Sequence, residues 1–238
     1  TFTYPTGGAP ALSDISFTLE HGKTLGIIGG TGSGKSTLIG LIPRFYDVQK
    51  VSVKVDGCDV RQYPLETLRR KIGLVPQKAL LFKGTIRENL LWGDEGATDD
   101  EIRDALRAAQ AQEVVDGKPE GLDYEVETGG RNFSGGQRQR LTIARALVRK
   151  PEVLILDDSA SALDFATDAA LRHALRELPW KPAVVIISQR TASIRFADEI
   201  LVLDDGKLAG RGTHDELLQT CEVYREIYES QFKKEDAR

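Results

Sequence analysis

One glycine-rich segment constrains the fold of this chain more than any other feature. Gly29-Gly-Thr-Gly-Ser-Gly-Lys-Ser36 fits the pattern G-x-x-x-x-G-K-[ST]. It follows the apolar run Leu25 to Ile28 and precedes the helical pattern Thr37 to Ile42, so it connects a strand to a helix. Glycines let backbone N–H groups turn inward around phosphate oxygens, and the helix start adds partial positive charge. The segment therefore predicts a phosphate-binding loop (P-loop, or Walker A motif) in an α/β fold.

The residue types around this loop also predict a metal site. Lys35 is expected to meet the β- and γ-phosphates of a nucleotide, and Ser36 to offer its hydroxyl to Mg²⁺. Asp157 ends the apolar strand Val153 to Leu156 and is expected to hold Mg²⁺ through water. The alternatives are a glycine-rich turn without a ligand and an aspartate that only caps a helix. The other residues of this segment that we predict to bind the cofactor are Gly29, Thr31, Gly32, Ser33, Gly34 and Thr37.

The order of strand and helix patterns indicates an α/β protein with a P-loop NTPase core. Strand-like runs that alternate with helical patterns predict a mostly parallel sheet. These runs are Leu25 to Ile28, Ile72 to Val75, Val153 to Leu156, Val184 to Ile187 and Ile200 to Leu203. Period-two alternation predicts an antiparallel β edge layer. It occurs in Phe2 to Tyr4, Ile15 to Leu19 and Val51 to Val55.

The middle of the chain has a different character. Strand signals disappear between about Phe82 and Arg131, while Asp99 to Gln112 carries apolar residues at helical spacing. We predict one domain over 1–238, with the ATPase core and β layer over about 1–81 and 150–238 and an inserted helical subdomain over about 82–149. The tail from His214 to Phe232 has the pattern of an amphipathic helix, which we expect to pack on its own core rather than on a partner.

Composition excludes several classes of function. The net charge is −4 and basic residues are dispersed among acids, so we expect no nucleic-acid partner. Cys58 and Cys221 have no metal-binding spacing and fit a reducing compartment. The apolar runs are far shorter than the roughly 20 residues that span a bilayer. Because the chain begins at Thr1, contains no Met and has no signal segment, we expect it to be part of a longer polypeptide.

A second glycine-rich segment, Phe133-Ser-Gly-Gly-Gln137, opens the next helical pattern. Together with three further segments it resembles the nucleotide-binding domain of ATP-binding cassette (ABC) transporters, over nearly the whole chain. Those segments are Val75-Pro-Gln77, Ser161-Ala-Leu-Asp164 and Ile187-Ser-Gln-Arg190. The family signature is usually Leu-Ser-Gly-Gly-Gln, and Phe133 replaces its Leu. The arginines that follow, Arg138, Arg140, Arg145 and Arg149, are expected to form a solvated or carboxylate-paired face.

The resemblance implies roles for the remaining candidate residues. Ser134, Gly135, Gly136 and Gln137 would bind the γ-phosphate of ATP held by a second, opposing domain, whereas an ordinary Ser-capped helix would explain Ser134 alone. Asp164 would join the cofactor-binding residues. Tyr4 would stack on adenine, unless it is a core or edge-strand tyrosine. Gln77 would sense Mg²⁺ or water and move the helical subdomain, unless it is a loop amide that caps a strand.

Two positions depart from the family pattern. The family has Glu where this chain has Asp158, and His where it has Gln189. Asp158 is shorter by one carbon–carbon bond, about 1.5 Å, although a general base must approach its proton to about 2.6–3.2 Å. Gln189 can donate an amide hydrogen but cannot become a cation. None of His21, His173 and His214 follows the strand Val184 to Ile187. ATP is therefore expected to bind well and to be cleaved poorly.

These departures, beside an intact signature, lead to a functional hypothesis. The chain would be one half of a heterodimeric exporter at the cytoplasmic face of the membrane, joined to transmembrane domains through the Gln77 loop and the helical subdomain. The segments Gly84 to Asn89 and Gly210 to His214 resemble exporters more than importers. Two alternatives stay open: a homodimer with slow turnover, and a nucleotide-gated regulatory module that never hydrolyses ATP.

Overall fold

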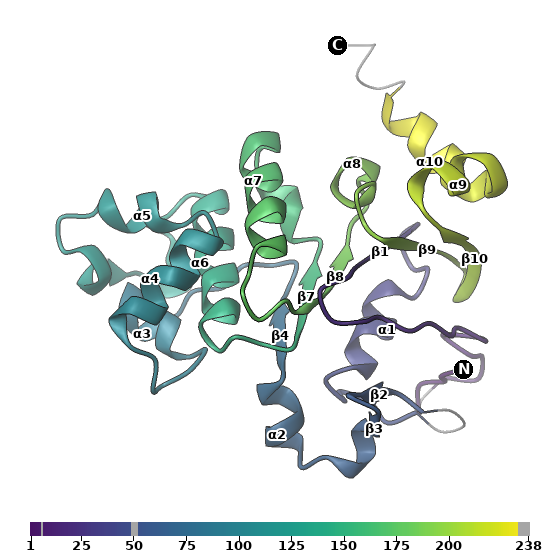
Figure 1. Ribbon diagram of the computed structural model, residues 1–238, viewed down its shortest axis with the longest axis horizontal. Coiled ribbons are helices and arrows are strands. Elements are labelled where there is room, and N and C mark those ends of the chain that lie inside the picture. The colour runs from purple at the N-terminus through teal and green to yellow at the C-terminus, as the bar shows by residue number, and fades with distance from the viewer. Residues whose placement is uncertain (6, 49–51, 233–238) are drawn as a thin grey trace. The chain divides into compact units, whose positions relative to one another are not determined.

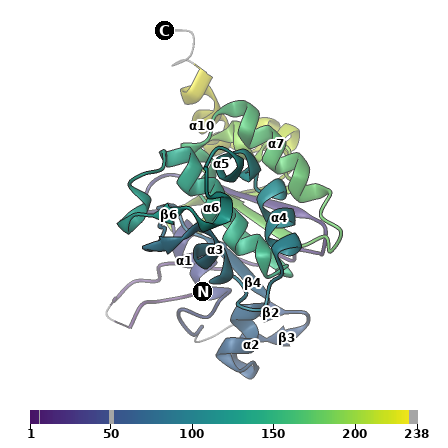
Figure 2. The same cartoon turned by 90° about the vertical axis from the view of Figure 1, so that its left-hand side faces the viewer.

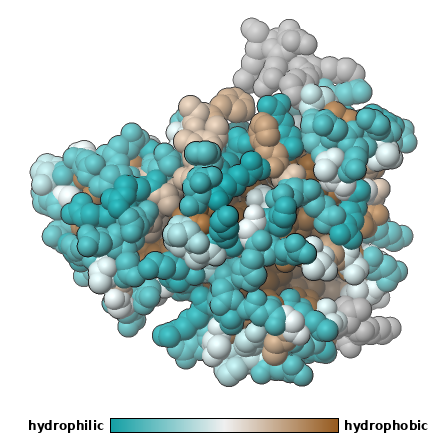
Figure 3. Space-filling model, viewed as in Figure 1, coloured by the Kyte–Doolittle hydropathy of each residue, from teal (hydrophilic) through white to brown (hydrophobic). Residues whose placement is uncertain are grey.

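The computed structural model describes residues 1–5, 7–48 and 52–232 (Figure 1). The chain forms two compact units, 1–72 with 184–238, and 73–183. The described part contains no helix that combines the length and the apolar character needed to cross a bilayer. On the face shown in Figure 3, hydrophilic residues cover most of the surface.

The first unit is built on four neighbouring strands in the order β10-β9-β1-β8. The central strand β1 (Thr24–Gly29) pairs in parallel with β8 (Ala183–Ile187) and with β9 (Glu199–Asp204), while β10 (Lys207–Gly212) runs antiparallel to β9. Every residue of β1 is buried, as expected for a strand with both faces covered. The P-loop follows directly, and α1 (Lys35–Leu41) begins at its lysine. This part of the sheet therefore places the loop at the carboxyl end of a fully buried strand.

Shorter elements complete this unit. A β-hairpin joins β2 (Lys54–Val55) to β3 (Cys58–Asp59), and η1 (Val60–Gln62) and α2 (Leu65–Arg70) follow. After β8 comes α8 (Thr191–Ile194), which packs on β1. A Cβ on Gly26 would lie 2.9 Å from Cβ of Ile194, so the glycine lets α8 approach the strand closely.

Two sequence predictions for this unit need correction. The antiparallel layer is smaller than predicted, because Phe2 forms only an isolated bridge with Leu12 and no strand covers 15–19. Exposure still alternates along 15–19, so the sequence pattern reflects a segment with one side partly buried. The segment is not a strand, because a strand also needs a hydrogen-bonded neighbour. Of the predicted run Val51 to Val55, Val51 lies outside the described residues. The tail forms two helices rather than one, α9 (His214–Thr220) and α10 (Glu222–Phe232), because Cys221 has extended backbone angles.

The second unit holds the neighbouring strands β4 (Ile72–Val75) and β7 (Val153–Asp157), and with them the helical region. Its central helix α6 (Gly135–Val148) packs against α3 (Ile86–Leu91) and α4 (Asp99–Ala108). Figure 2 shows these helices gathered together with α5 (Gln112–Asp116). The unit also contains the 12-residue helix α7 (Phe165–Arg176). Its remaining elements are short: β5 (Gly84–Thr85), η2 (Gly121–Asp123), β6 (Glu125–Val126), η3 (Thr128–Gly130) and η4 (Ser159–Ala162).

The four arginines for which the sequence predicted a solvated or carboxylate-paired face also bind the backbone of the loops around α6. Each donates to backbone carbonyl groups: Arg138 to Gly130 and Phe133, Arg140 to Gln110, Arg145 to Leu80, and Arg149 to Gly93. Arg140 also pairs with the carboxylate of Glu113. The four side chains hold the loops of the second unit around the helix. All five strands predicted for the parallel sheet are present, which confirms the predicted fold class.

Candidate functional site

The P-loop is a compact turn closed by its own lysine. Lys35 Nζ donates to the backbone oxygens of Gly29 and Gly30, at 2.8 and 2.7 Å, and to Ser33 Oγ at 3.2 Å. Ser33 is buried, whereas Thr31 and Ser36 are exposed. The loop therefore holds the positive charge of Lys35, and the next residue in the chain, Ser36, is exposed.

Two glycines of the loop are required by the fold. Gly34 precedes α1 with φ 96°, and a Cβ there would lie 2.6 Å from Cδ2 of Leu12. A Cβ on Gly29 would lie 2.1 Å from the backbone oxygen of Leu203 in β9. At position 29 a side chain would collide with the backbone of β9, and at position 34 the positive φ would strain any residue other than glycine.

The two remaining glycines of the loop are open instead. A Cβ on Gly30 or Gly32 would meet nothing within 4 Å, and Gly32 has φ 82°. The backbone at these positions can therefore be approached closely, which is what a phosphate group requires. The residues of the loop fit a nucleotide phosphate.

Tyr4 lies beside the start of α1. Its hydroxyl is 2.8 Å from Oγ1 of Thr37, so the N-terminal segment is tied to the residue that follows the P-loop motif. Its ring packs edge-on against Phe2 and Tyr46, with centroids 4.9 and 5.2 Å away. The ring is half-buried, and Tyr46 is 44% exposed. The two tyrosines form an aromatic pair next to the phosphate loop.

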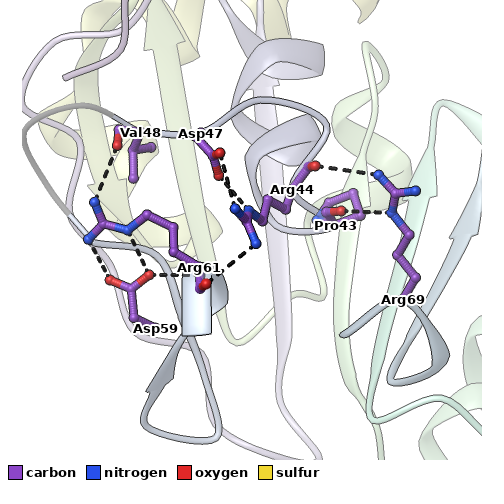
Figure 4. Close-up of polar contacts among 7 residues, drawn as sticks. All are labelled: Pro43, Arg44, Asp47, Val48, Asp59, Arg61 and Arg69. Atoms are coloured by element: carbon purple, nitrogen blue, oxygen red, sulfur yellow. Dashed lines mark hydrogen bonds and ion pairs between the residues drawn. The ribbon is translucent and has the colours of Figure 1, made fainter. Parts of the chain in front are cut away.

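A network of arginines fixes the segment that carries Tyr46 (Figure 4). Arg44 pairs with Asp47 on the other side of Tyr46, with Nε and Oδ1 2.5 Å apart, and also donates to the backbone oxygen of Arg61. Arg61 in turn pairs with Asp59 at 2.7 Å. Hydrogen bonds from Arg61 lower the pKa of Asp59 to about 2, so this carboxylate stays charged at neutral pH. Arg69 of α2 donates to the backbone oxygen of Pro43.

The predicted acidic residues lie in the second unit. Asp157 ends β7, and Asp158 follows in the left-handed region, with φ 46° and ψ 28°. Ser161 Oγ donates to the backbone oxygen of Asp158 at 2.8 Å and holds this turn. Gln77 Nε2 donates to Oδ2 of Asp158 at 3.2 Å. The structure thus joins two of the three residues that we predicted to be catalytic.

The signature segment is also a helix cap. Ser134 Oγ accepts from the backbone N–H of Gln137 at 3.2 Å, and the Gln137 side chain accepts from the N–H of Ser134 at 2.9 Å. A Cβ on Gly136 would lie 3.1 Å from the backbone oxygen of Ala162. Capping and packing therefore explain three of the four residues, and our expectation that capping explains Ser134 alone was wrong. A Cβ on Gly135 would meet nothing within 4 Å, so Gly135 is open to approach.

Asp164 has a capping role of the same kind. It accepts from the backbone N–H of Thr167 at 2.9 Å and from its hydroxyl at 2.8 Å, which caps α7. These hydrogen bonds, from the backbone first, lower the pKa of Asp164. The carboxylate is therefore a fixed negative group at the beginning of α7.

Gln189 lies in the first unit, between β8 and α8. Its backbone oxygen accepts a hydrogen bond from Nε2 of Gln231 at 2.6 Å. Sequence reasoning missed Gln231, because a glutamine in an amphipathic helix gives no local sign of a distant contact. It missed Tyr46 for a similar reason, since its contact with Tyr4 follows from the turn after α1.

Comparison with known proteins decides the family. The sequence profile of a family described as ABC transporter matches residues 12–161. The chain belongs to the ABC transporter family. Curated ABC relatives match it over almost its full length. An uncharacterized ABC transporter ATP-binding protein of Mycobacterium tuberculosis (strain ATCC 25618 / H37Rv) is 48% identical over 234 residues, which are 97% of this chain and 40% of that protein.

Two further relatives carry more informative names. An ATP-dependent lipid A-core flippase of Vibrio cholerae is 46% identical, over 98% of this chain and 40% of the flippase. A probable multidrug resistance ABC transporter ATP-binding/permease protein of Bacillus subtilis is 46% identical, over 97% of this chain and 40% of that protein. The ABC chain thus spans 40% of the length of these relatives.

Solved structures agree with this assignment. The structure of a bacterial Atm1-family ABC exporter with ATP bound superposes with a TM-score of 0.90 at 36% identity, covering 97% of this chain and 40% of the exporter chain. The ABC family match and this superposition together support the α/β P-loop fold described above.

Proposed function

We propose that this chain is the ATP-binding and ATP-hydrolysing motor domain of an exporter, with a weakened hydrolytic site of its own. The similarity to an exporter with ATP bound, to a lipid A-core flippase and to an ATP-binding/permease protein supports export. Closure of two such domains around ATP would drive transport. The division into a core over about 1–81 and 150–238 and a helical subdomain over about 82–149 is part of this proposal.

The contact between Gln77 and Asp158 is the main support for the proposal that this hydrolytic site is weakened. The short carboxylate stands at the end of β7, where the family has Glu, and the amide of Gln77 occupies one of its oxygens. A base must reach a water that is itself positioned against the γ-phosphate. The amide orients this carboxylate, but it cannot make up for the missing methylene, so Asp158 is poorly suited to this role. The loss of positioned general-base assistance typically costs about 10²–10⁴-fold in rate.

The residues present fit ATP and Mg²⁺. Lys35 and the open backbone at Gly30 and Gly32 would hold the phosphates, and Tyr4 would stack on adenine. Ser36, Gln77 and Asp157 offer hydroxyl, amide and carboxylate oxygens, which are the hard ligands that Mg²⁺ prefers. When bound, Mg²⁺ neutralises charge on the phosphates. Gln189 would donate an amide hydrogen to the γ-phosphate in place of the family's His.

The partners follow from the same proposal. The residues Ser134 to Gln137 match the family signature, although Phe133 before them does not. Together with Asp164 they would complete the ATP site of a second, different nucleotide-binding domain. In its capping box Ser134 Oγ acts as an acceptor, so the hydroxyl proton can still be donated to a phosphate. The Gln77 loop and the helical subdomain would meet transmembrane domains, and the chain would then lie at the cytoplasmic face of the membrane. Two readings remain as alternatives: a homodimer with slow turnover, and a regulatory module that does not hydrolyse ATP.

The decisive experiment compares ATP turnover of the chain with that of Asp158→Glu and of the double variant Asp158→Glu/Gln189→His. We expect the double variant to be faster by at least about 10²-fold while the affinity for ATP changes little. Equal rates would show that the site is not weakened. A Lys35→Ala variant, which loses the phosphate contact, serves as the control that measured turnover comes from this P-loop.

A second experiment separates the heterodimer from its alternatives. Mixing the chain with a candidate partner domain that has an intact catalytic glutamate should raise ATP turnover sharply, and Ser134→Arg in this chain should abolish the rise. A rise that survives Ser134→Arg would exclude the proposed role of the signature. Turnover by this chain alone that rises with the square of its concentration would favour the homodimer instead.

A further inference from the structure

The start of α8 is held by a side chain from the far end of the described chain. Gln231, in the last turn of α10, accepts at Oε1 from the backbone N–H of Thr191 at 2.9 Å and from Oγ1 of Thr191 at 3.0 Å. Its Nε2 donates to the backbone oxygen of Gln189 at 2.6 Å. The contacts fall on both sides of Arg190, so one amide group clamps the segment from Gln189 to Thr191.

This clamp replaces a missing local cap. The residue before α8 is Arg190, which makes no side-chain cap, and a guanidinium group has no acceptor for the first helical N–H groups. Thr191 is only 1% exposed, so water does not readily satisfy its N–H group. An unsatisfied buried donor costs roughly 1–3 kcal/mol. Gln231 therefore supplies, from a distant helix, the acceptor that an N-cap residue supplies elsewhere.

Both flanks of the clamped segment are fixed by other contacts. The N–H of Ser188 donates to the backbone oxygen of Ile27 in β1, and its Oγ accepts from the N–H of Arg190 at 2.9 Å. On the other side, fully buried Ile194 packs against Gly26. The backbone on either side of Gln189 thus has little freedom, and the bond from Gln231 sets the direction of the Gln189 carbonyl group between them.

The helix that carries Gln231 is itself anchored. Tyr224, about two turns earlier on the same face of α10, is 0% exposed, and its hydroxyl lies 2.8 Å from Nδ1 of His214 in α9. Burial raises the pKa of Tyr224 to about 12, so it stays neutral and keeps this contact at physiological pH. The inward face of α10 therefore holds Gln231 at a fixed position relative to α9.

We propose that Gln231 is a positioning residue of the nucleotide site, which acts through the backbone of Gln189 and couples α10 to ATP cleavage. This inference rests on the proposed function, in which the side chain at position 189 faces the γ-phosphate. By fixing the peptide unit of Gln189, Gln231 sets the direction in which that side chain leaves the backbone. Because the clamp holds the backbone, it acts equally on glutamine or histidine at this position. Any event that displaces α10 releases the residue that contacts the phosphate.

Three variants separate this role from a structural one. Gln231→Met keeps the length of the side chain but removes both functions of the amide. Gln231→Glu keeps acceptors for Thr191 but loses the donor to Gln189. Ser230→Ala is the matched control on the same helix, because Ser230 Oγ donates to the backbone oxygen of Ile227 within α10.

The measurements are kcat and KM for Mg-ATP in the chain that carries Asp158→Glu/Gln189→His, together with hydrogen exchange at the Thr191 amide. For Gln231→Met we expect kcat to fall by about 10- to 100-fold, KM to stay within about twofold, and protection of Thr191 to be lost. For Gln231→Glu we expect the same fall in kcat with Thr191 still protected. Ser230→Ala should change none of these three quantities.

The outcomes distinguish failure of this inference from failure of the proposed function. If both Gln231 variants keep kcat while Gln189→Ala in the Asp158→Glu background lowers it, position 189 matters but the clamp does not, and the inference is wrong. If Gln189→Ala also changes neither ATP affinity nor turnover, the proposed role of position 189 fails and the inference fails with it. A fall in kcat for Gln231→Met that Gln231→Glu fully restores would show that capping of α8 is the whole role of Gln231, and would also overturn the inference.

Discussion

Gln77 and Asp158 are 81 residues apart in sequence, yet Nε2 of Gln77 lies 3.2 Å from Oδ2 of Asp158. The bond joins the loop after β4 to the turn after β7, two neighbouring strands of the sheet. The amide of Gln77 therefore donates to the carboxylate of Asp158, the group that the proposed chemistry uses as a base. The orientation of that carboxylate therefore depends on the loop that would report to the membrane-spanning part.

Removing this donor should lower ATP turnover more than it lowers stability. Gln77 is exposed, so Gln77→Ala should reduce the free energy of unfolding by at most about 1 kcal/mol. Turnover should fall by about tenfold because Asp158 loses its orienting partner. Steady-state hydrolysis and urea denaturation measure the two effects, with the exposed neighbour Lys78→Ala as control. Unchanged turnover in Gln77→Ala would mean that the hydrogen bond is incidental.

Two adjacent glycines should respond in opposite ways to the same added methyl group. Gly29→Ala puts a Cβ 2.1 Å from the backbone oxygen of Leu203, so it should destabilise the chain by about 1–3 kcal/mol or more. Gly30→Ala meets nothing within 4 Å, so it should fold normally and yet bind ATP more weakly, because the methyl group stands where a phosphate approaches. Thermal unfolding and nucleotide titration test both. A stable Gly29→Ala variant, or a Gly30→Ala variant with full affinity, would contradict the geometry described for the loop.

Variants of Tyr4 should separate the ring from its hydroxyl group. Tyr4→Phe loses the contact with Thr37 and should weaken ATP binding only slightly. Tyr4→Ala also loses the ring and should weaken binding by about 1–3 kcal/mol, the range found for a base stacked on an aromatic side chain. GTP and ATP should be affected alike, because every base has a stacking face. If Tyr4→Ala binds ATP as tightly as the unaltered chain, Tyr4 belongs to the aromatic packing with Phe2 and Tyr46 and not to the nucleotide site.

Acid should weaken the second unit through Glu101. Hydrogen bonds from Lys150, and then from Thr98, lower the pKa of Glu101 from 4.5 to about 2. A carboxylate whose pKa is lowered by folding contributes stability that is present above its unfolded pKa and is lost as the pH falls through the folded one. The loss should therefore occur between about pH 4.5 and 2.

The measurement is stability against pH for Glu101→Gln, which should be less stable at neutral pH and lose less stability in this window. Exposed Glu120→Gln is the control, since Glu120 has no ion pair among the residues that the structure describes. If both variants follow the pH dependence of the unaltered chain, the pairing of Glu101 with Lys150 contributes nothing.

Much of the fold could be predicted because its causes are local. The parallel strands followed from short β-branched runs, and the helices that begin at Asp99 and His214 followed from apolar residues at helical spacing. The antiparallel layer was over-predicted for 15–19 because alternating exposure reports burial of one face and says nothing about a ladder partner. The break at Cys221 was missed because the apolar pattern continues across it.

The sequence by itself determined the family, the P-loop, the signature segment and the substitution of Asp158 and Gln189, since each depends on residue types at fixed spacing. Gly34 is an example: the loop needs a positive φ at this position, and glycine adopts it without strain. Tertiary structure alone decided that Gln77 reaches Asp158, that Tyr46 packs on Tyr4, and that Gln231 clamps Gln189. These contacts join segments that are distant in the chain, and only the packing of helices and strands brings a particular donor to a particular acceptor.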